Sequence, residues 1–189
     1  MKILLHSCCG PCASHCLSVL QAAGHEVTLF FSNANIAPSQ EFERRLEALY
    51  KLADITRTPV IVDPPVHQEW LCRAARGFEN EPEKGLRCAR CFRYSLCRTA
   101  MMREKQGFDT FTTSLTVSPH KHSPTIFNVA TSIDASHFLQ IDFKKKNGFL
   151  HSIQLAKEYG LYRQNYCGCE FSLAALKRHL KEKEELNHV

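Results

Sequence analysis

The amino-acid sequence predicts an α/β fold, in which a parallel sheet with helices on both faces is followed by a helical C-terminal extension. Two observations predict it. Short apolar runs alternate with amphipathic segments in the order β-α-β-α-β at the start of the chain, and strands that are buried on both faces have such continuous apolar runs. In addition, 189 residues with 44% hydrophobic and 23% charged residues suit one globular domain.

The first three strands and two helices are expected to alternate before residue 65. Each strand is a short apolar run rich in β-branched or aromatic residues, and the first ends at the sequence CCGPC. Each helix has apolar residues at helical spacing; Gly24 ends the first helix, and Ser39 is the expected N-cap of the second. The expected elements are strand 2–7, helix 12–23, strand 25–32, helix 39–54 and strand 59–62.

The remaining elements are mostly helical. Gly107 ends a long amphipathic helix, and the strand after it, DTFTTSL, has polar residues at its exit. The last helix carries Leu173, Leu176 and Leu180 on one stripe. The expected elements are helix 67–77, helix 88–106, strand 109–115, helix 124–136, extended segment 138–143, helix 149–160 and helix 172–187.

One domain is expected over residues 1–189, with the sheet in about residues 1–120 and the C-terminal extension in about residues 121–189. The net charge of +5 and the pI near 8.7 allow an anionic partner. No apolar stretch is long enough to span a bilayer, and the N-terminal sequence MKILLHSCC has no export signal. A cytoplasmic protein with no membrane contact is therefore expected.

Cysteine is the unusual residue of this composition, because a chain of this size needs no disulfides to fold. In a reducing compartment, clustered cysteines indicate metal binding or redox chemistry. Three clusters are present: CCGPC at residues 8–12, a C-x-x-C at residues 88–91 and a C-x-C at residues 167–169. Cys72 and Cys97 have no close partner in sequence and are expected to be structural.

The first cluster follows the first strand, at the edge of a parallel sheet where ligands bind. A helix N-terminus lowers the pKa of a thiol, so Cys8 and Cys9 are candidates for a functional role. Cys12 and Cys16 lie within the expected helix, where a structural role is as well supported as a functional one. His120 follows the fourth strand, so it is expected at the same edge.

The second and third clusters add two pairs. Cys88 and Cys91 are expected to share one face at a helix start, and four thiolates from two distant pairs make a closed site for zinc or for an iron–sulfur cluster. The spacing of the cysteines alone does not distinguish a zinc site from an iron–sulfur cluster. Cys167 and Cys169 can chelate a metal or form a strained, easily reduced disulfide, and this surplus pair favours redox use.

Two other functions are compatible with these thiols. Cys9 and Cys12 form a C-x-x-C between a strand and a helix, which is also the arrangement of thioredoxin-like thiol–disulfide oxidoreductases. Too few residues precede the motif for the extra β-α unit of that fold. Alternatively, structural zinc and the basic charge would make a zinc-stabilised nucleic-acid-binding module.

Six segments together resemble one family, the cobalamin-independent epoxyqueuosine reductases (the QueH family). They are HSCCGPCAS, FFSNANIAP followed by EFERR, GLRCARCF, FTTSLTVSPHKH, DFKKKNGF and YRQNYCGCEFS, and they span about residues 3–172 in order. The resemblance implies a fold related to the nucleotide-binding α/β domains of the PP-loop ATPases and their relatives (the HUP type), and the last step of queuosine synthesis. In that step the epoxide oxygen of epoxyqueuosine at the tRNA wobble position leaves as water.

The resemblance also implies the cofactors and the residues that serve them. Similar proteins carry a [4Fe-4S] cluster and can hold an additional mononuclear iron, and they take electrons from an external donor. Motif matching places the cluster on Cys8, Cys9, Cys88 and Cys91. The Cys167–Cys169 pair would then be a catalytic redox-active disulfide, or would ligate the extra iron. The expected substrate-binding residues are Asn33, Asn35, Arg44, His120 and Arg163.

Overall fold

The structure is a computed structural model that describes residues 1–186. No helix among them is long and apolar enough to cross a membrane. Besides regular helices and strands, they include a π-helical turn (Leu71–Ala75) and a 3₁₀ turn (Ser114–Val117). The elements are β1 (Lys2–His6), α1 (Gly10–Ala22), β2 (Glu26–Phe31), α2 (Ser39–Thr56), β3 (Val60–Val62), α3 (His67–Trp70), α4 (Leu86–Gln106), β4 (Thr110–Thr113), α5 (Ser123–Asp134), α6 (Gly148–Glu158) and α7 (Glu170–Leu186).

The four strands form one parallel sheet in the order β3-β2-β1-β4, which confirms the predicted fold class. Ile3 of β1 pairs with Val27 of β2 on one side and with Thr110 of β4 on the other. From β1 the chain therefore adds β2 and then β3 on one side, and it then returns and adds β4 on the other side of β1. In open parallel sheets, ligands bind outside the carboxyl ends of the strands at such a reversal. Here that point lies between β1 and β4.

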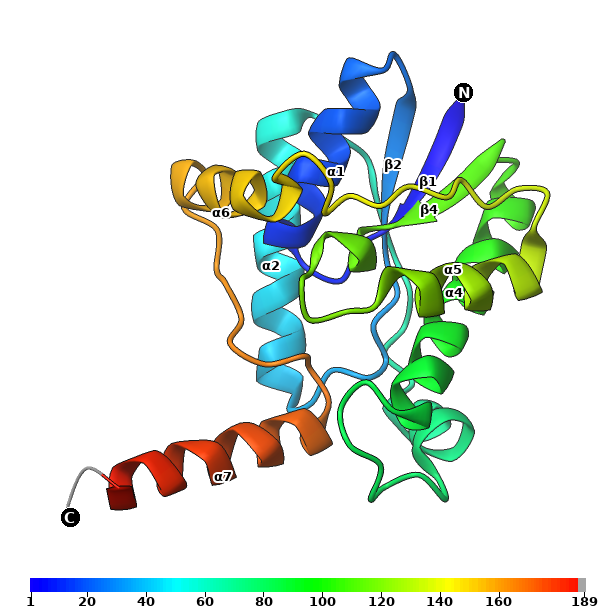
Figure 1. Ribbon diagram of the computed structural model, residues 1–189. Helices are drawn as coiled ribbons and strands as arrows, with labels where there is room; N and C mark the ends of the chain where they lie inside the picture. The colour runs from blue at the N-terminus through cyan, green and yellow to red at the C-terminus, as the bar shows by residue number, and fades with distance from the viewer. Residues whose placement is uncertain (187–189) are drawn as a thin grey trace.

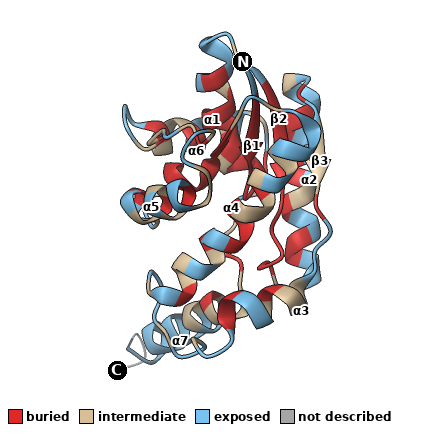
Figure 2. Cartoon of the chain, turned by 90° about the vertical axis from the view of Figure 1, so that its right-hand side faces the viewer, coloured by how far each residue is buried: buried red, intermediate tan, exposed pale blue. Residues whose placement is uncertain are grey.

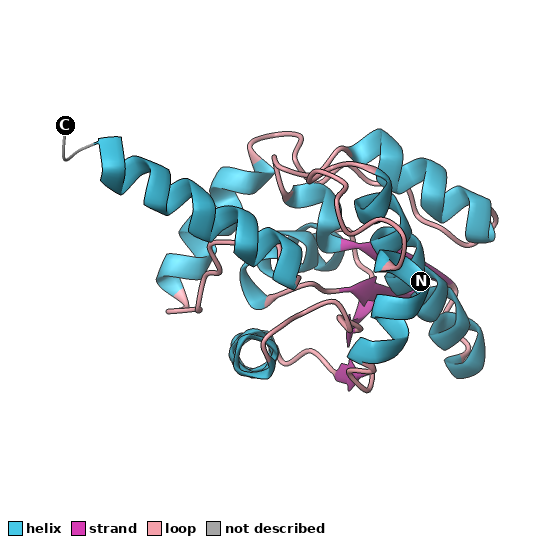
Figure 3. Cartoon of the chain, turned by 90° about the horizontal axis from the view of Figure 1, so that it is seen from below, coloured by secondary structure: helices cyan, strands magenta, loops and turns pink. Residues whose placement is uncertain are grey.

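Helices cover both faces of the sheet (Figure 3). Because side chains alternate along a strand, Ile3 and Leu5 face one layer, in which they pack with residues of α1, α2 and α6. Leu4 faces the opposite layer together with Phe30 and Phe111, and there it packs against α4 and α5. β1, β2 and β4 are accordingly mostly buried on both sides (Figure 2), as their apolar runs predict, whereas the edge strand β3 is half-buried.

The C-terminal third covers the sheet with helices and then leaves it. The predicted extended segment at 138–143 contributes only an isolated bridge between Phe138 and Phe111, because its amide and carbonyl groups mostly bond elsewhere. Helix α6 lies against α1, and α7 projects from the body of the protein (Figure 1). The prediction extended the last helix to residue 187, which lies outside the described residues.

Several boundaries differ from the prediction by a few residues. Ser39 is the first residue of α2 rather than its N-cap; Pro38 occupies the cap position, with no side-chain hydrogen bond. The helix predicted at 67–77 divides into α3 and the π-helical turn. Gly107 ends α4 in the left-handed conformation, with φ 69°, as predicted.

Candidate functional site

The loop between β1 and α1 brings the first thiol cluster to the reversal point of the sheet. Cys9 is the N-cap of α1, and its sulfur accepts a hydrogen bond from the amide of Cys12 at 3.4 Å. Gly10 allows α1 to begin here, because a Cβ atom at that position would lie 2.5 Å from the carbonyl oxygen of Ala48 in α2. The close approach of two helices therefore fixes where the thiols of this loop lie.

Cys8, Cys9 and Cys12 form a triad whose sulfur atoms all lie within 4.8 Å of one another. Hydrogen bonds from the Cys12 and Cys9 thiols lower the pKa of Cys8 well below its ordinary value. Burial raises the pKa of Cys9 to about 12, and donation to Cys8 raises the pKa of Cys12. Within the triad, Cys8 is thus the thiol most easily deprotonated, and the three sulfurs can act as a soft metal-binding group.

The end of β4 supports this triad from the other side of the reversal point. The hydroxyl of Ser114 accepts the amide hydrogen of Cys8 at 3.2 Å and lies 3.6 Å from its sulfur. Gln164, which follows α6, donates its side-chain amide to the sulfur of Cys9 at 3.0 Å. Residues far apart in the sequence therefore hold both sulfurs in one place.

The second cluster lies in the first two turns of α4. The amide of Lys84 donates to the sulfur of Cys88 at 3.3 Å, whereas Cys91 packs beside Trp70. Burial raises the pKa of both thiols. The guanidinium of Arg87 fixes the loop before the helix by donating to three backbone carbonyl groups between residues 78 and 81.

The third cluster lies in the irregular segment between α6 and α7, and Arg45 of α2 holds it. Arg45 is 1% exposed and donates to the carbonyl oxygens of Cys167 (2.9 Å) and Tyr166 (3.1 Å). Its remaining charge is met by Glu41, at 2.7 Å. The thiol of Cys169 lies 3.6 Å from the hydroxyl of Ser172, on the first turn of α7.

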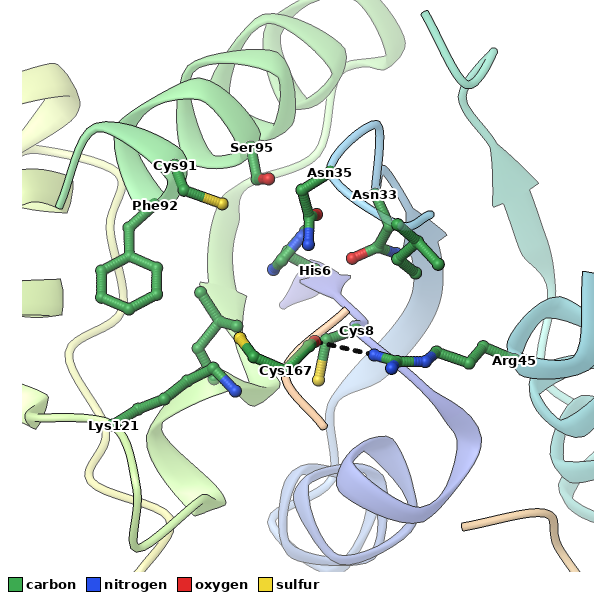
Figure 4. A pocket seen from close by; sticks show the side chains of 12 residues that line it. His6, Cys8, Asn33, Asn35, Arg45, Cys91, Phe92, Ser95, Lys121 and Cys167 are labelled. Carbon is green, nitrogen blue, oxygen red and sulfur yellow. Dashed lines mark hydrogen bonds between the residues drawn. The ribbon is translucent and has the colours of Figure 1, made fainter. Parts of the chain in front are cut away.

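Two hollows that share part of their lining lie among the three clusters. The smaller, about 20 Å³, is enclosed by Cys8, Cys91 and Cys167 together with polar side chains from the strand ends (Figure 4). The larger has a volume of about 580 Å³ and receives thiols from all three clusters. These thiols are Cys8, Cys12, Cys88, Cys167 and Cys169. Thiols from all three clusters that the sequence singled out therefore line these hollows, which we together call the thiol cavity.

All ten cysteines are free thiols, so the structure does not support the predicted redox-active disulfide between Cys167 and Cys169. Cys167 is exposed, whereas Cys169 is partly buried. Cys16 is fully buried in the core and donates its thiol to the backbone carbonyl of Cys12. Of the two cysteines that were left open, the structure brings Cys12 to the triad and packs Cys16 away from it.

The predicted substrate-binding residues divide into two groups. Asn33 and Asn35 line the small hollow, where Asn33 donates to the carbonyl of Ser7 at 2.9 Å. His120 and Arg163 line the large hollow. Arg44 lies outside both hollows, and its guanidinium stacks 5.9 Å from the ring centre of Tyr162.

Among the charged residues of the cavity that the sequence did not single out, Arg45 and Lys121 line both hollows. Arg45 is the neighbour of the predicted Arg44; helical spacing could have found it, because Arg45 follows Phe42 and precedes Leu49 on the apolar face of α2. Lys121 lies next to the predicted His120 and lines both hollows. Burial alone would lower the pKa of Lys121, but the electrostatic attraction of the Cys167 and Cys8 sulfurs raises it.

Comparison with known proteins shows the family to which this chain is similar. The family described as epoxyqueuosine reductase QueH matches residues 3–175, which include every thiol of the cavity. Proteins named epoxyqueuosine reductase QueH are similar over most of this chain. The protein from Streptococcus pyogenes serotype M1 is 38% identical, over 90% of this chain and 70% of its own length. Those from Acinetobacter baylyi and Thermotoga maritima are 34% and 35% identical, over 94% and 96% of this chain and 83% and 94% of their own lengths. The resemblance of the six segments is thus confirmed, and the chain belongs to the epoxyqueuosine reductase QueH family.

Proposed function

We propose that this protein reduces epoxyqueuosine at the wobble position of tRNA to queuosine. The observation that carries the proposal is the thiol cavity, in which three thiol clusters meet at the reversal point of a parallel sheet. The reaction takes two electrons and two protons, breaks both C–O bonds of the epoxide, and yields an alkene and water. The tRNA substrate would place the protein in the cytoplasm, and an external one-electron donor would supply the electrons.

The donor set of the cavity suits a [4Fe-4S] cluster. Cysteine sulfur is the ligand that such clusters use, and the triad presents three sulfurs within 4.8 Å of one another. The buried indole N–H of Trp70 has no hydrogen-bond partner among the described residues, and Cys91 packs against it. Such a donor beside a ligand sulfur is one of the features that set cluster potentials.

We assign the cluster to Cys8, Cys9, Cys88 and Cys91, and Cys12 offers an alternative ligand because it completes the triad. When bound, the cluster would supply electrons one at a time and offer a Lewis acid beside the substrate. The chain itself would shape the cavity, hold the thiols in place and exclude water from the reacting bond.

Cys167 and Cys169 are the catalytic thiols of this proposal. Cys167 faces the small hollow together with Cys8 and Cys91, and Cys169 faces the large one. As free thiols they would ligate an additional iron beside the cluster. The larger hollow would take the modified base beside His120 and Arg163, and Asn33 and Asn35 would meet it from the small hollow.

The reaction is tested with protein prepared without oxygen. Iron and sulfide of about four each per chain are expected, and incubation with epoxyqueuosine-tRNA and a chemical reductant should yield queuosine. Deletion of the gene should make epoxyqueuosine accumulate in cellular tRNA, and the intact gene should restore queuosine. Zinc in place of iron would favour a structural metal site. Activity without metal would favour a thiol–disulfide oxidoreductase that uses Cys9 and Cys12.

The ligand set is tested by comparing Cys88→Ser with Cys12→Ser. If Cys88 is a ligand, Cys88→Ser loses the cluster and the activity together, whereas Cys12→Ser retains both. The reverse result would move the fourth ligand to the triad. In Cys167→Ser the cluster should remain while any additional iron is lost, which total iron and sulfide report separately. Loss of the cluster in this variant would contradict the assigned roles.

A further inference from the structure

Lys121 is the lysine of the thiol cavity whose ammonium group lies among the sulfurs. It lines both hollows, and its side chain extends toward Cys8 and Cys167 (Figure 4). It follows the 3₁₀ turn after β4, so it enters at the reversal point of the sheet, where ligands of parallel α/β folds bind. Its place in the fold therefore directs a positive charge at the point where the substrate would react.

The backbone around Lys121 is held firmly enough to aim this side chain. The ammonium of Lys144 donates to the carbonyl oxygen of Lys121 at 2.8 Å and to the hydroxyl of Ser123 at 2.5 Å. Ser123 in turn donates to Asp142 at 3.0 Å. The amide of Lys121 donates to the carbonyl of Ser118 at 3.3 Å. Lys144 and Asp142 thus serve as the support of Lys121, and Lys144 has no place in the cavity itself.

The ammonium of Lys121 has no oxygen or nitrogen partner among the described residues, and no carboxylate of these residues forms an ion pair with it. Two of the three guanidinium groups of the cavity, those of Arg45 and Arg87, differ in this respect. Arg45 is committed to Glu41 and two carbonyl groups, and Arg87 to three carbonyl groups. Lys121 therefore has N–H donors free for an oxygen atom that enters the cavity.

We propose that Lys121 holds the epoxide oxygen of the substrate and stabilises the negative charge that develops on it as the C–O bonds break. The inference rests on the proposed function and adds a catalytic residue to it. The epoxide gains two electrons from the external one-electron donor and two protons from solvent, and it becomes an alkene and water. Lys121 supplies charge and hydrogen bonds, so its own composition is unchanged at the end of the cycle. Fixed donors aimed at developing charge in a dry site are among the strongest catalytic contributions.

The test compares Lys121→Met with Lys121→Arg and with a control, Lys105→Met. The control removes an exposed lysine near the C-terminal end of α4, which is the end away from Cys88 and Cys91. Single-turnover reduction of epoxyqueuosine-tRNA should slow by about 10²–10³-fold in Lys121→Met and less in Lys121→Arg. Lys105→Met should react at the wild-type rate. Iron, sulfide and the visible spectrum should match the wild type in all three variants. A normal rate in Lys121→Met, or a lost cluster, would overturn the proposal.

A binding measurement separates contact with the oxygen from general attraction to RNA. Wild-type protein should bind epoxyqueuosine-tRNA more tightly than queuosine-tRNA, which lacks that oxygen, and Lys121→Met should lose this preference. Equal weakening toward both tRNAs would overturn the proposal, because it would indicate a phosphate contact. Ethylammonium should partly restore Lys121→Ala, whereas tetramethylammonium, which has no N–H donor, should not. If wild-type protein reduces no epoxyqueuosine-tRNA, the proposed function itself fails.

Discussion

The thiols of Cys8, Cys9 and Cys12 are held by regular secondary structure, whereas Cys167 and Cys169 lie in an irregular segment that other parts of the chain hold in place. In the first region, the end of β1 and the start of α1 fix three sulfurs within a few residues. In the second, the main contacts are the hydrogen bonds from Arg45 to the carbonyl oxygens of Cys167 and Tyr166, which lie more than a hundred positions further along the sequence.

This difference teaches where each region is vulnerable. At the start of α1, the backbone brings the thiols together and Ser114 and Gln164 add hydrogen bonds to them, so a substitution there should remove a sulfur without moving the loop. Between α6 and α7, the hydrogen bonds from Arg45 hold the backbone in place. A substitution of Arg45, which lies outside the segment, should therefore move both Cys167 and Cys169. The first region should therefore be most sensitive to replacement of its own cysteines. The second should be most sensitive to replacement of Arg45, which holds its backbone.

The largest effect is expected from Cys8→Ser. Serine keeps the size of the side chain but offers no soft ligand, so the variant should lose the proposed cluster. Loss of residues that merely support a metal ligand costs about 10–100-fold, so loss of this ligand should cost more. Iron and sulfide analysis and the reduction rate measure the effect. Cys72→Ser, which removes an exposed thiol of the π-helical turn, should change neither. A Cys8→Ser protein with full iron content would contradict the assignment.

The next largest effect is expected from Arg45→Met, which leaves Glu41 buried without its partner. Such a loss costs about 3–5 kcal/mol of stability, measured by urea denaturation. Because the carbonyl groups of Cys167 and Tyr166 also lose their donor, the reduction rate should fall by about 10–100-fold while the cluster remains.

A double variant separates the two effects of Arg45. Glu41→Gln combined with Arg45→Met removes the unpaired charge, so it should regain much of the stability. The rate should stay low, since the Cys-x-Cys segment still lacks its support. If rate and stability recovered together, Arg45 would act only through the stability of the fold.

A smaller effect is expected from Gly168→Ala, within the Cys-x-Cys segment. Gly168 has φ 139°, and a Cβ atom there would lie 3.1 Å from Nη1 of Arg45 and 3.2 Å from Nδ2 of Asn35. The variant should lose about 1–3 kcal/mol of stability and react more slowly. Gly24→Ala is the control, because Gly24 has φ 78° with nothing within 4 Å of the added Cβ. A slower reaction in both variants would show that backbone strain alone, rather than displacement of Arg45, causes the effect.

The same contrast explains what the sequence could predict. The apolar runs and the glycine stops locate β1, α1 and β2 to within a few residues, because local patterning decides them. The carboxyl-edge rule then predicts that Cys8 and Cys9 meet a ligand, and the cavity lies there. Features that depend on one strand, one helix or the loop between them were thus within reach.

Features that depend on distant contacts were not. Arg45 and Lys121 are ordinary charged residues in the sequence, and nothing local distinguishes Arg45 from Arg44 except the face of α2 that each occupies. The segment at 138–143 has the composition of a strand but little backbone pairing beyond Phe138, because tertiary packing overrode local propensity. The sequence alone did not show that all three thiol clusters share one cavity, because this depends on the order of the strands in the sheet.

The smallest effect is expected at the far side of α1, where regular structure again fixes a contact. His15 of α1 and His151 of α6 are joined through their Nδ1 atoms at 2.8 Å, an arrangement that needs one protonated and one unprotonated nitrogen. Burial, and then the charge of His151, lower the pKa of His15 from its ordinary value of 6.5. The unfolded chain therefore binds this proton at higher pH than the folded protein does, so stability should fall as the pH drops below about 6.5.

Thermal denaturation between pH 7.5 and pH 5 measures this dependence. His15→Gln should flatten it by a few degrees, because glutamine keeps a polar group in the contact but does not titrate. His25→Gln, in the turn between α1 and β2, should retain the wild-type slope. If His15→Gln kept the full slope, the acid sensitivity would lie elsewhere, and His6, whose pKa burial also lowers, would be the next residue to replace. Because His6 ends β1 beside the triad, that result would couple acid sensitivity to the thiol cavity instead of the α1–α6 contact.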